Sequence, residues 1–239
     1  MSFDSGLFWS TLFSGTFFRA ALVTLALTVL AHALAILLSL PLALALNSRS
    51  RAWRWFATVY VGVFRGLPAL LLLLFVWNGL PQISPIFREA WFSPFVAALF
   101  ALALNEAAYQ VEINRAALGA VDEGQFQAGA ALGLRKGLVY MLIVIPQALR
   151  VALPPTVNEF ITLLKTTSLA SVISLTELMA VTQQSVASTF RYAEFYAVAS
   201  IYYLGMVYIL MLIQKRIERR FAWSKGHAAS AGQAAASRA

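Results

Sequence analysis

The sequence contains no cysteine among its 239 residues, which excludes disulfide bridges, cysteine-based metal sites and thiolate catalysis. Charge is also scarce. Charged residues make up 12% of the chain, about half the share of a soluble domain, whereas hydrophobic residues make up 60% and the mean hydropathy is +0.74. This composition predicts a protein of the lipid bilayer. It argues against a disordered chain, a coiled coil and a nucleic-acid-binding module, although the net charge is +8.

None of the thirteen glycines stands in the pattern G-x-x-x-x-G-K-[ST], so the chain lacks the phosphate-binding loop by which many proteins hold ATP. The two histidines, His32 and His227, lie far apart and form no Ser-His-Asp or metal-ligand grouping. We expect His32 to be a packed or interface residue of the first membrane span rather than a proton relay. An enzyme is disfavoured, and we expect no catalytic group, metal or bound cofactor on this chain.

Long stretches without Asp, Glu, Lys or Arg indicate membrane spans, because a helix of about 20 residues crosses a hydrocarbon core of about 30 Å. Three such stretches cover residues 20–48, 66–87 and 195–214. Two further apolar segments are interrupted by charge, among others by Glu106 in one and Glu159 in the other. The sequence therefore predicts an all-α integral membrane protein with five transmembrane helices, at about residues 18–46, 57–80, 93–113, 153–175 and 195–215.

Lysine and arginine are concentrated in alternate connections, after the first, third and fifth spans. The opposite side carries only Arg19, Arg88 and Arg191. Because positive residues stay on the cytoplasmic side, we expect the N-terminus outside and the C-terminus in the cytoplasm. Residues 1–17 then form an external segment, residues 18–220 the transmembrane domain, and residues 221–239, which end in small and polar residues, a disordered cytoplasmic tail.

The connection between the third and fourth spans, about residues 114–152, is long for a protein of this kind. It is rich in small residues around Ala128 and closes with Gly133. A helix of small residues that ends in glycine exposes little side chain and suits close docking into another protein. Periodicity alone allows equally well a surface helix that only closes the connection.

The same segment resembles the cytoplasmic signature of ABC-importer permeases: E-A-A, three residues, Gly, nine residues, then I-x-L-P. The matching positions are Gln127, Ala128, Gly129, Gly133, Ile143 and Pro146. The spacing is intact. Gln127 replaces the acid and Gly129 replaces an alanine, so the resemblance supports the helix but not a charge contact from position 127.

Other segments are similar to permeases for polar amino acids, the family of histidine, glutamine, glutamate and arginine importers. They are R-G-L-P at residues 65–68, where Leu67 departs from R-G-T-P, and residues 102–115 and 154–173. The resemblance implies a coupling helix at about residues 124–134, which contacts an ATPase subunit dimer that uses ATP. It also implies a second permease subunit, identical or related, an external solute-binding protein, and a place in the cell inner (cytoplasmic) membrane.

Polar residues inside the spans indicate where a solute could bind. An ionisable group at a helix centre costs about 2.5–3.5 kcal/mol or more, so it should face protein, water or a ligand. Glu159, Thr162 and Thr166 follow one another at i, i+3 and i+7 and share one helix face, and Asn105 belongs to a similar face of the preceding span. We expect these four residues to line a site for a polar L-amino acid.

The alternative is that these groups bond one another across helices and only hold the bundle together. The substrate role is favoured for Glu159, whereas the two roles are evenly balanced for Asn105. Related importers of basic amino acids often carry Asp where this chain has Thr166, which argues mildly against a strictly cationic substrate. A stand-alone secondary carrier or channel, driven by an ion gradient, remains the alternative function, and an integral-membrane enzyme is a third.

Overall fold

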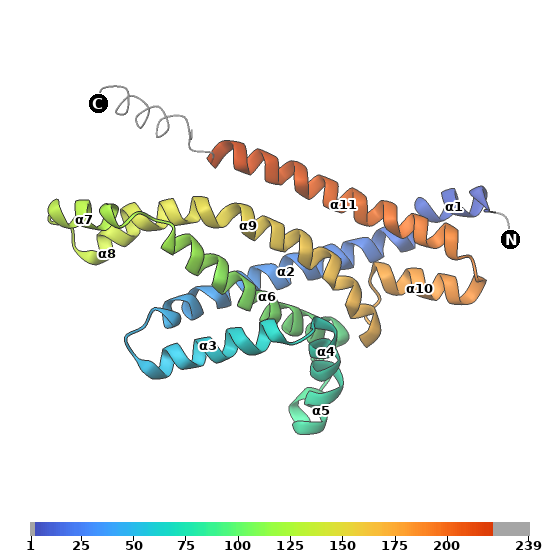
Figure 1. Ribbon diagram of the computed structural model, residues 1–239. Helices are drawn as coiled ribbons and strands as arrows, with labels where there is room; N and C mark the ends of the chain where they lie inside the picture. The colour runs from blue at the N-terminus through green and yellow to red at the C-terminus, as the bar shows by residue number, and fades with distance from the viewer. Residues whose placement is uncertain (1–2, 222–239) are drawn as a thin grey trace.

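The computed structural model describes residues 3–221, which form helices joined by short turns, with no strand in that range (Figure 1). Of the tail expected at residues 221–239, all but Phe221 lies outside the described residues. Four helices between residues 3 and 221 are long and apolar enough to cross a membrane, and a bent helix pair makes a fifth span if it counts as one.

The chain begins with a short helix and a long one. The short helix, α1 (Ser5–Leu12), starts at Asp4, whose carboxylate accepts a hydrogen bond from the backbone N–H of Leu7 at 3.0 Å. The long helix, α2 (Gly15–Leu46), has 32 residues and a length of about 48 Å. The described part of the segment expected to be external, residues 3–17, is thus largely helical.

The second predicted span, residues 57–80, is not one helix. It consists of α3 (Arg51–Gly66), α4 (Ala69–Leu74), the π-helical turn η1 (Phe75–Gly79) and α5 (Leu80–Ile83). The two halves meet at an angle of 102°. Pro68 causes the break, because proline has no N–H and disfavours helical geometry in the residue before it; Leu67 accordingly has an extended ψ of 135°.

The next elements form a hairpin of long helices. After η2 (Pro85–Arg88), the chain runs through α6 (Pro94–Gly119), α7 (Glu123–Ala131), α8 (Lys136–Val139), η3 (Tyr140–Val144), α9 (Ile145–Thr166) and η4 (Thr167–Ile173). The last four are one continuous rod of 38 residues. The predicted fourth span, residues 153–175, is therefore only the second half of a longer helix, and most of the connection at residues 114–152 is helical.

The chain continues with α10 (Leu178–Thr189) and ends, as far as it is described, with α11 (Tyr192–Phe221). Glu177 is fully buried at the start of α10, where its Oε1 accepts from the N–H of Ala180 at 2.7 Å. The hydroxyls of Thr24 on α2 and Tyr203 on α11 donate to its Oε2 at 3.2 and 3.3 Å. This carboxylate, which interrupts an apolar segment of the sequence, thus ties three helices together.

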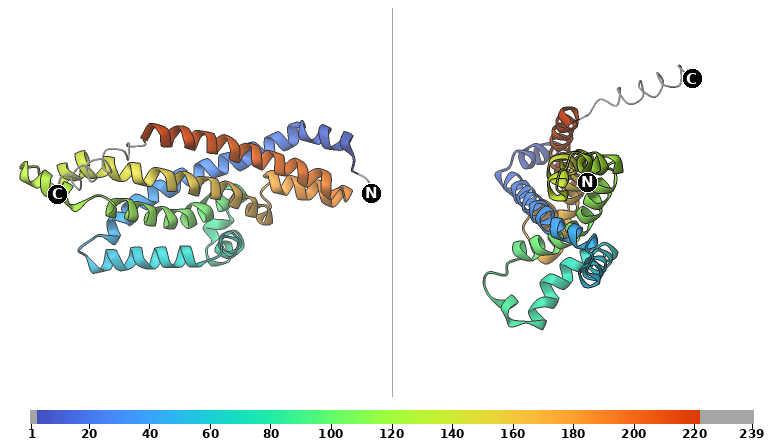
Figure 2. Two further views of the ribbon diagram at one scale, coloured as in Figure 1. Left: turned by 45° about the horizontal axis from the view of Figure 1, so that its top comes forward. Right: turned by 90° about the vertical axis from the view of Figure 1, so that its left-hand side faces the viewer.

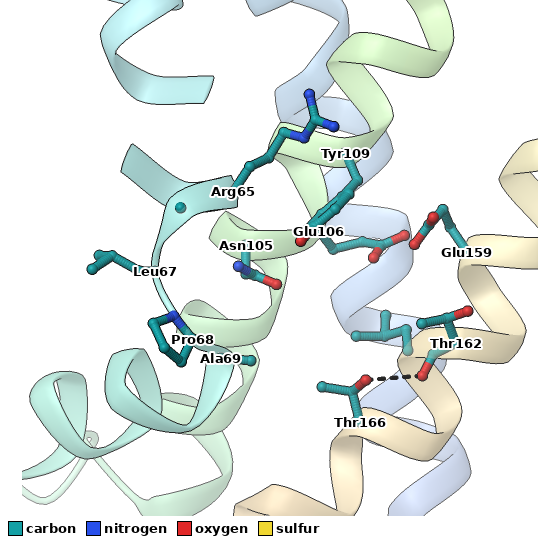
Figure 3. A pocket seen from close by; sticks show the side chains of 12 residues that line it. Arg65, Leu67, Pro68, Ala69, Asn105, Glu106, Tyr109, Glu159, Thr162 and Thr166 are labelled. Atoms are coloured by element: carbon teal, nitrogen blue, oxygen red, sulfur yellow. Dashed lines mark hydrogen bonds between the residues drawn. The ribbon is translucent and has the colours of Figure 1, made fainter. Parts of the chain in front are cut away.

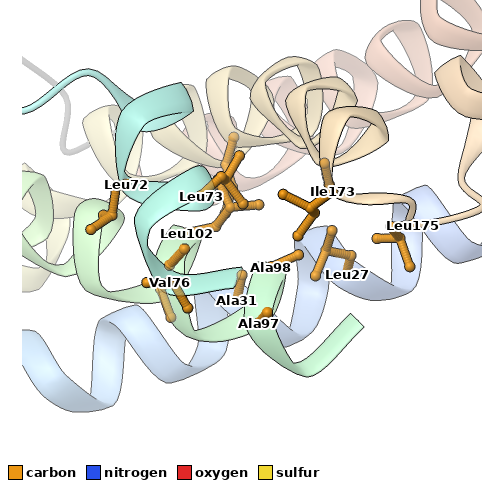
Figure 4. Close-up of a cluster of buried hydrophobic side chains, with 14 of the residues drawn as sticks. Leu27, Ala31, Leu72, Leu73, Val76, Ala97, Ala98, Leu102, Ile173 and Leu175 are labelled. Atoms are coloured by element: carbon orange, nitrogen blue, oxygen red, sulfur yellow. The ribbon is translucent and has the colours of Figure 1, made fainter. Parts of the chain in front are cut away.

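The main core lies where α2 and α6 cross and α4 and η4 close over them (Figure 4). Alanines on both helices make this close approach possible, as small residues do between membrane helices; Ala31 of α2 and Ala97 and Ala98 of α6 are fully buried. Leu27, Leu73 and Ile173 fill the remaining space. Many leucines on the outer faces of α2 and α11 are exposed, as expected of surfaces that meet lipid.

Two groups of elements occupy opposite ends of the molecule. In Figures 1 and 2, α7 and α8 lie at one end of the long bundle, and α1 and α10 lie at the other. The pair α4 and α5 turns away from the bundle axis, as the 102° bend requires. The break at Leu67–Pro68 therefore faces the middle of α6, between the two ends.

Candidate functional site

A cavity of about 440 Å³ lies between the α3–α4 break, α6 and α9. Its lining comprises Arg65, Gly66, Leu67, Pro68, Ala69, Asn105, Glu106, Tyr109, Glu159, Thr162, Leu163 and Thr166 (Figure 3). The segment around Pro68, where the helix breaks, forms one wall of the cavity, and the polar faces of α6 and α9 form the other two. All four residues predicted to bind substrate therefore line one cavity.

The four predicted residues differ in the hydrogen bonds that they form within the protein. The hydroxyls of Thr162 and Thr166 donate to backbone carbonyls one turn earlier in α9, at 3.1 and 3.0 Å, which leaves their oxygens able to accept. The Nδ2 of Asn105 donates to the carbonyl of Phe64 at 2.6 Å and so anchors the end of α3. The carboxylate of Glu159 is half-buried and has no hydrogen-bond or ion-pair partner among the described residues.

The structure adds charged residues that the sequence analysis did not assign to the site. Arg65 lies over the ring of Tyr109, with its Cζ 5.4 Å from the ring centroid, and its Nη1 is 3.8 Å from Oε1 of Glu112. Glu112 itself accepts two hydrogen bonds from Arg115, at 3.0 and 2.7 Å. The guanidinium of Arg65 thus lies at the cavity rim and is only loosely paired with Glu112.

Glu106 is the other addition. It is only 4% exposed, yet it lines the cavity beside Asn105. In the sequence it stands out as the only charge inside an otherwise apolar stretch, and the cost of such a charge in the bilayer was a signal that it faces a partner or a ligand. His32 is buried, as expected, but its Nδ1 lies 3.2 Å from Oε1 of Glu106.

This lining can bind an amino acid at both of its charged ends. Carboxylates accept strong charge-assisted hydrogen bonds from an ammonium group, and a guanidinium donates in the same way to a carboxylate. Glu106 and Glu159 provide the first kind of group and Arg65 the second. Within residues 3–221, no group of three or more His, Asp or Glu side chains could hold a metal ion.

The second predicted site, the coupling segment, lies at the α7 end of the bundle. Gln127, Ala128 and Gly133 are exposed there, and Leu132 is 77% exposed. Pro146 is exposed in the first turn of α9, and Ile143 is half-buried under α7. The outer face of α7 thus exposes small residues together with the polar side chain of Gln127, and no described part of the chain covers it.

Gly129 is the only buried residue of α7. A Cβ at this position would lie 2.8 Å from Cγ2 of Val139 and 3.3 Å from Cδ1 of Ile143. This glycine, at the third position of the E-A-A pattern, allows α7 to lie directly against α8 and the π-helical turn η3. Glycine rather than alanine occupies this position because the side chain of Val139 leaves no room for a Cβ.

Gly129→Ala is therefore expected to lower the thermal midpoint of the purified chain by about 2–12 °C, because overpacking costs about 1–3 kcal/mol. Val139→Ala in the same chain should restore most of the loss, since it removes the atoms that clash. Gly137→Ala is the control, because a Cβ there meets no atom within 4 Å. Equal midpoints for the Gly129→Ala and Gly137→Ala proteins would contradict the tight contact.

Comparison with known proteins gives a consistent result. A family model described as "Binding-protein-dependent transport system inner membrane component" matches residues 35–223. A probable amino-acid permease protein of Bacillus subtilis is 38% identical over 155 residues, which cover 65% of this chain and 68% of that protein. The L-cystine transport system permease protein of the same organism is 36% identical over 166 residues, 70% of this chain and 67% of the relative.

A solved structure is similar over nearly the whole chain. It is described as an amino acid ABC transporter with histidines, and one of its chains superposes with a TM-score of 0.83 at 34% sequence identity. The superposition covers 92% of this chain and 100% of the other. This chain therefore shares its overall fold with a chain of a solved amino acid ABC transporter.

Proposed function

This chain belongs to the family of binding-protein-dependent transport system inner membrane components, and we propose that its central cavity is where a polar L-amino acid binds during import. The chain is the membrane permease subunit of an ABC importer for amino acids, located in the inner membrane. One observation carries the proposal: Glu106, Glu159 and Arg65 come together in one cavity between segments far apart in the sequence.

The same proposal gives the chain an orientation, with the α7 end in the cytoplasm and the N-terminus outside. Basic residues support it. The α2–α3 connection with the first turn of α3, the start of α8 and the late part of α11 all lie toward the α7 end (Figure 1). They carry Arg49, Arg51, Arg54, Arg135, Lys136, Lys215, Arg216 and Arg219. Retention of positive charge on the cytoplasmic side accounts for this asymmetry.

The energy for import comes from partner subunits in this proposal. A dimer of separate ATPase subunits binds and hydrolyses ATP and contacts α7, a solute-binding protein delivers the amino acid from outside, and a second permease subunit completes the channel. Gln127 and Gly129 depart from the E-A-A pattern, which favours a related sister chain as the second permease. The proposal assigns ATP to these partners and no cofactor to this chain.

The contacts of α7 provide a path from the ATPases to the cavity. Gly129 packs on Val139 and Ile143, and these belong to the rod that continues without interruption to Glu159 and Thr166. A displacement of α7 would therefore move the α9 wall of the cavity relative to α6. The π-helical turn at Tyr140–Val144 lies between α8, on which α7 packs, and the α9 wall of the cavity. Such turns are frequent at functional sites.

The test is purification of the tagged chain from its native membranes, followed by reconstitution into liposomes. We expect an ATPase subunit to co-purify in a fixed ratio, and uptake of a polar amino acid to require ATP and the solute-binding protein. The number of different permease chains in the complex reports whether the partner is a copy or a sister. A chain that purifies alone and transports without ATP would instead be a secondary carrier.

A further inference from the structure

The two carboxylates of the cavity come from different helices and face each other. Glu106 projects from α6 and Glu159 from α9, and Figure 3 shows their carboxylate groups pointing toward one another. In the membrane interior, where water does not screen them, two such charges repel strongly unless a cation lies between them. The arrangement is thus suited to a positively charged group of the ligand.

Glu106 is held so that one oxygen is engaged and the other is available. Its Oε1 accepts from Nδ1 of His32 at 3.2 Å and from Nε2 of Gln110 at 3.4 Å. Because an ionised carboxylate only accepts hydrogen bonds, Nδ1 of His32 carries the hydrogen. The Oε2 atom has no partner among the described residues, where every fully buried side-chain nitrogen or oxygen has one. Oε2 is therefore in contact with the cavity.

His32 is itself fixed in place. It is 8% exposed, and its ring forms a T-shaped contact with that of Phe160, at a centroid distance of 5.0 Å and an interplanar angle of 77°. His32 belongs to α2 and Phe160 to α9, so the imidazole sits between all three helices that surround Glu106. A second contact, from the hydroxyl of Thr156 to Oε1 of Gln110 at 3.1 Å, holds Gln110 in the same way.

Arg65, the one arginine of the cavity lining, forms no ion pair with Glu106 or Glu159. The guanidinium of Arg65 is directed to the opposite rim, where it lies over Tyr109 and 3.8 Å from Glu112. The two threonine hydroxyls and Asn105 add no positive charge. With the imidazole of His32 neutral beside Glu106, the lining carries two carboxylates and one guanidinium, which is one negative charge more than a zwitterion requires.

We propose that Glu106 is a further substrate-contacting residue, that His32 positions it, and that Glu106 and Glu159 together bind the side-chain cation of a basic amino acid. The α-carboxylate of that ligand faces Arg65. The inference rests on the proposed function of the cavity. Thr166 stands where related importers of basic amino acids often have Asp, and its presence argued mildly against a strictly cationic substrate. In this proposal Glu106 of α6 provides the second carboxylate, so that argument no longer applies.

Equilibrium binding to the purified importer, without the solute-binding protein, tests this with arginine and citrulline. The two ligands have nearly the same shape, but only arginine carries a side-chain charge. We expect the wild-type assembly to bind arginine at least about tenfold more tightly, the order of a charged hydrogen bond. Glu106→Gln should remove this preference while changing citrulline binding less than about threefold. Glu89→Gln, on the exposed connection before α6, is the control.

His32 is tested as a positioning residue by two substitutions. His32→Leu should lower the arginine preference as Glu106→Gln does, because no donor then holds Oε1. His32→Gln, which keeps a hydrogen-bond donor, should restore much of it. A purely structural role of His32 would instead lower arginine and citrulline binding together, and the glutamine variant would not recover the ratio of the two affinities.

The outcomes separate this inference from the proposed function. Equal affinity of the wild-type assembly for arginine and citrulline, or equal loss of both in the Glu106→Gln protein, overturns the inference. An assembly that still takes up a neutral amino acid with ATP would then retain the proposed function. If the wild-type assembly imports no amino acid with ATP and its solute-binding protein, the proposed function fails, and the inference fails with it.

Discussion

Replacing Glu159 with alanine is expected to weaken amino-acid binding to the importer about 10- to 100-fold, the equivalent of one charged hydrogen bond of about 1.5–3 kcal/mol. The expectation has two physical reasons. The carboxylate lines the cavity, and no described residue donates to it. Its removal therefore takes away a group that the ligand uses and leaves no polar partner of the protein unpaired. Folding and assembly should be unaffected.

Glu159→Gln separates charge from shape, because it keeps the size of the side chain. We expect it to bind an amino acid as weakly as the alanine variant does, within about threefold. Glu89→Gln again serves as the control, and the measurement is equilibrium binding together with the yield of co-purified ATPase. Unchanged binding in both Glu159 variants would contradict a substrate role. Loss of the ATPase from the complex would instead support the alternative that Glu159 holds the bundle together.

The polar faces of the spans could be predicted from the sequence because they depend on local geometry. Residues at i, i+3 and i+7 share a helix face in any α-helix, and residues 159–166 are all α-helical. The composition indicated in the same way that the helices cross a membrane. The family signature around Gly133 depends only on spacing along the chain, and it too was visible.

Contacts between distant segments could not be predicted in this way. Nδ1 of His32 and Oε1 of Glu106 meet across 74 positions, and nothing in either local sequence specifies the partner. Glu177 lies just beyond the predicted fourth span, and its local sequence does not specify that its carboxylate accepts a hydrogen bond from Thr24, 153 positions away. The bend at Pro68 was different. A proline after Leu67 is a recognisable break signal, and the continuous span predicted at residues 57–80 gave its apolar composition more weight than that signal.

Gly133→Val is expected to lower the amount of amino acid imported per ATP hydrolysed at least about tenfold, while ATP hydrolysis continues. Gly133 ends α7 with a positive φ of 72°. In this geometry the N–H of Leu134 donates to the carbonyl of Gly129 at 3.1 Å, and the N–H of Gly133 donates to that of Ala130 at 3.0 Å. A β-branched residue at such a φ is strained by about 1–3 kcal/mol, so the end of α7, the proposed coupling helix, should change its conformation.

Gly133→Asn is the matched control, because asparagine adopts positive φ far more readily than valine. A Cβ at this position meets no atom of the described chain within 4 Å, so within the permease itself either side chain has room. Near-normal coupling in the Asn variant and uncoupling in the Val variant would locate the requirement in the backbone of α7. Equal uncoupling in both would locate it in the partner ATPase, whose surface would then fill the space beside Gly133. Normal coupling in both would contradict the assignment of α7 as the element that transmits ATP hydrolysis to the cavity.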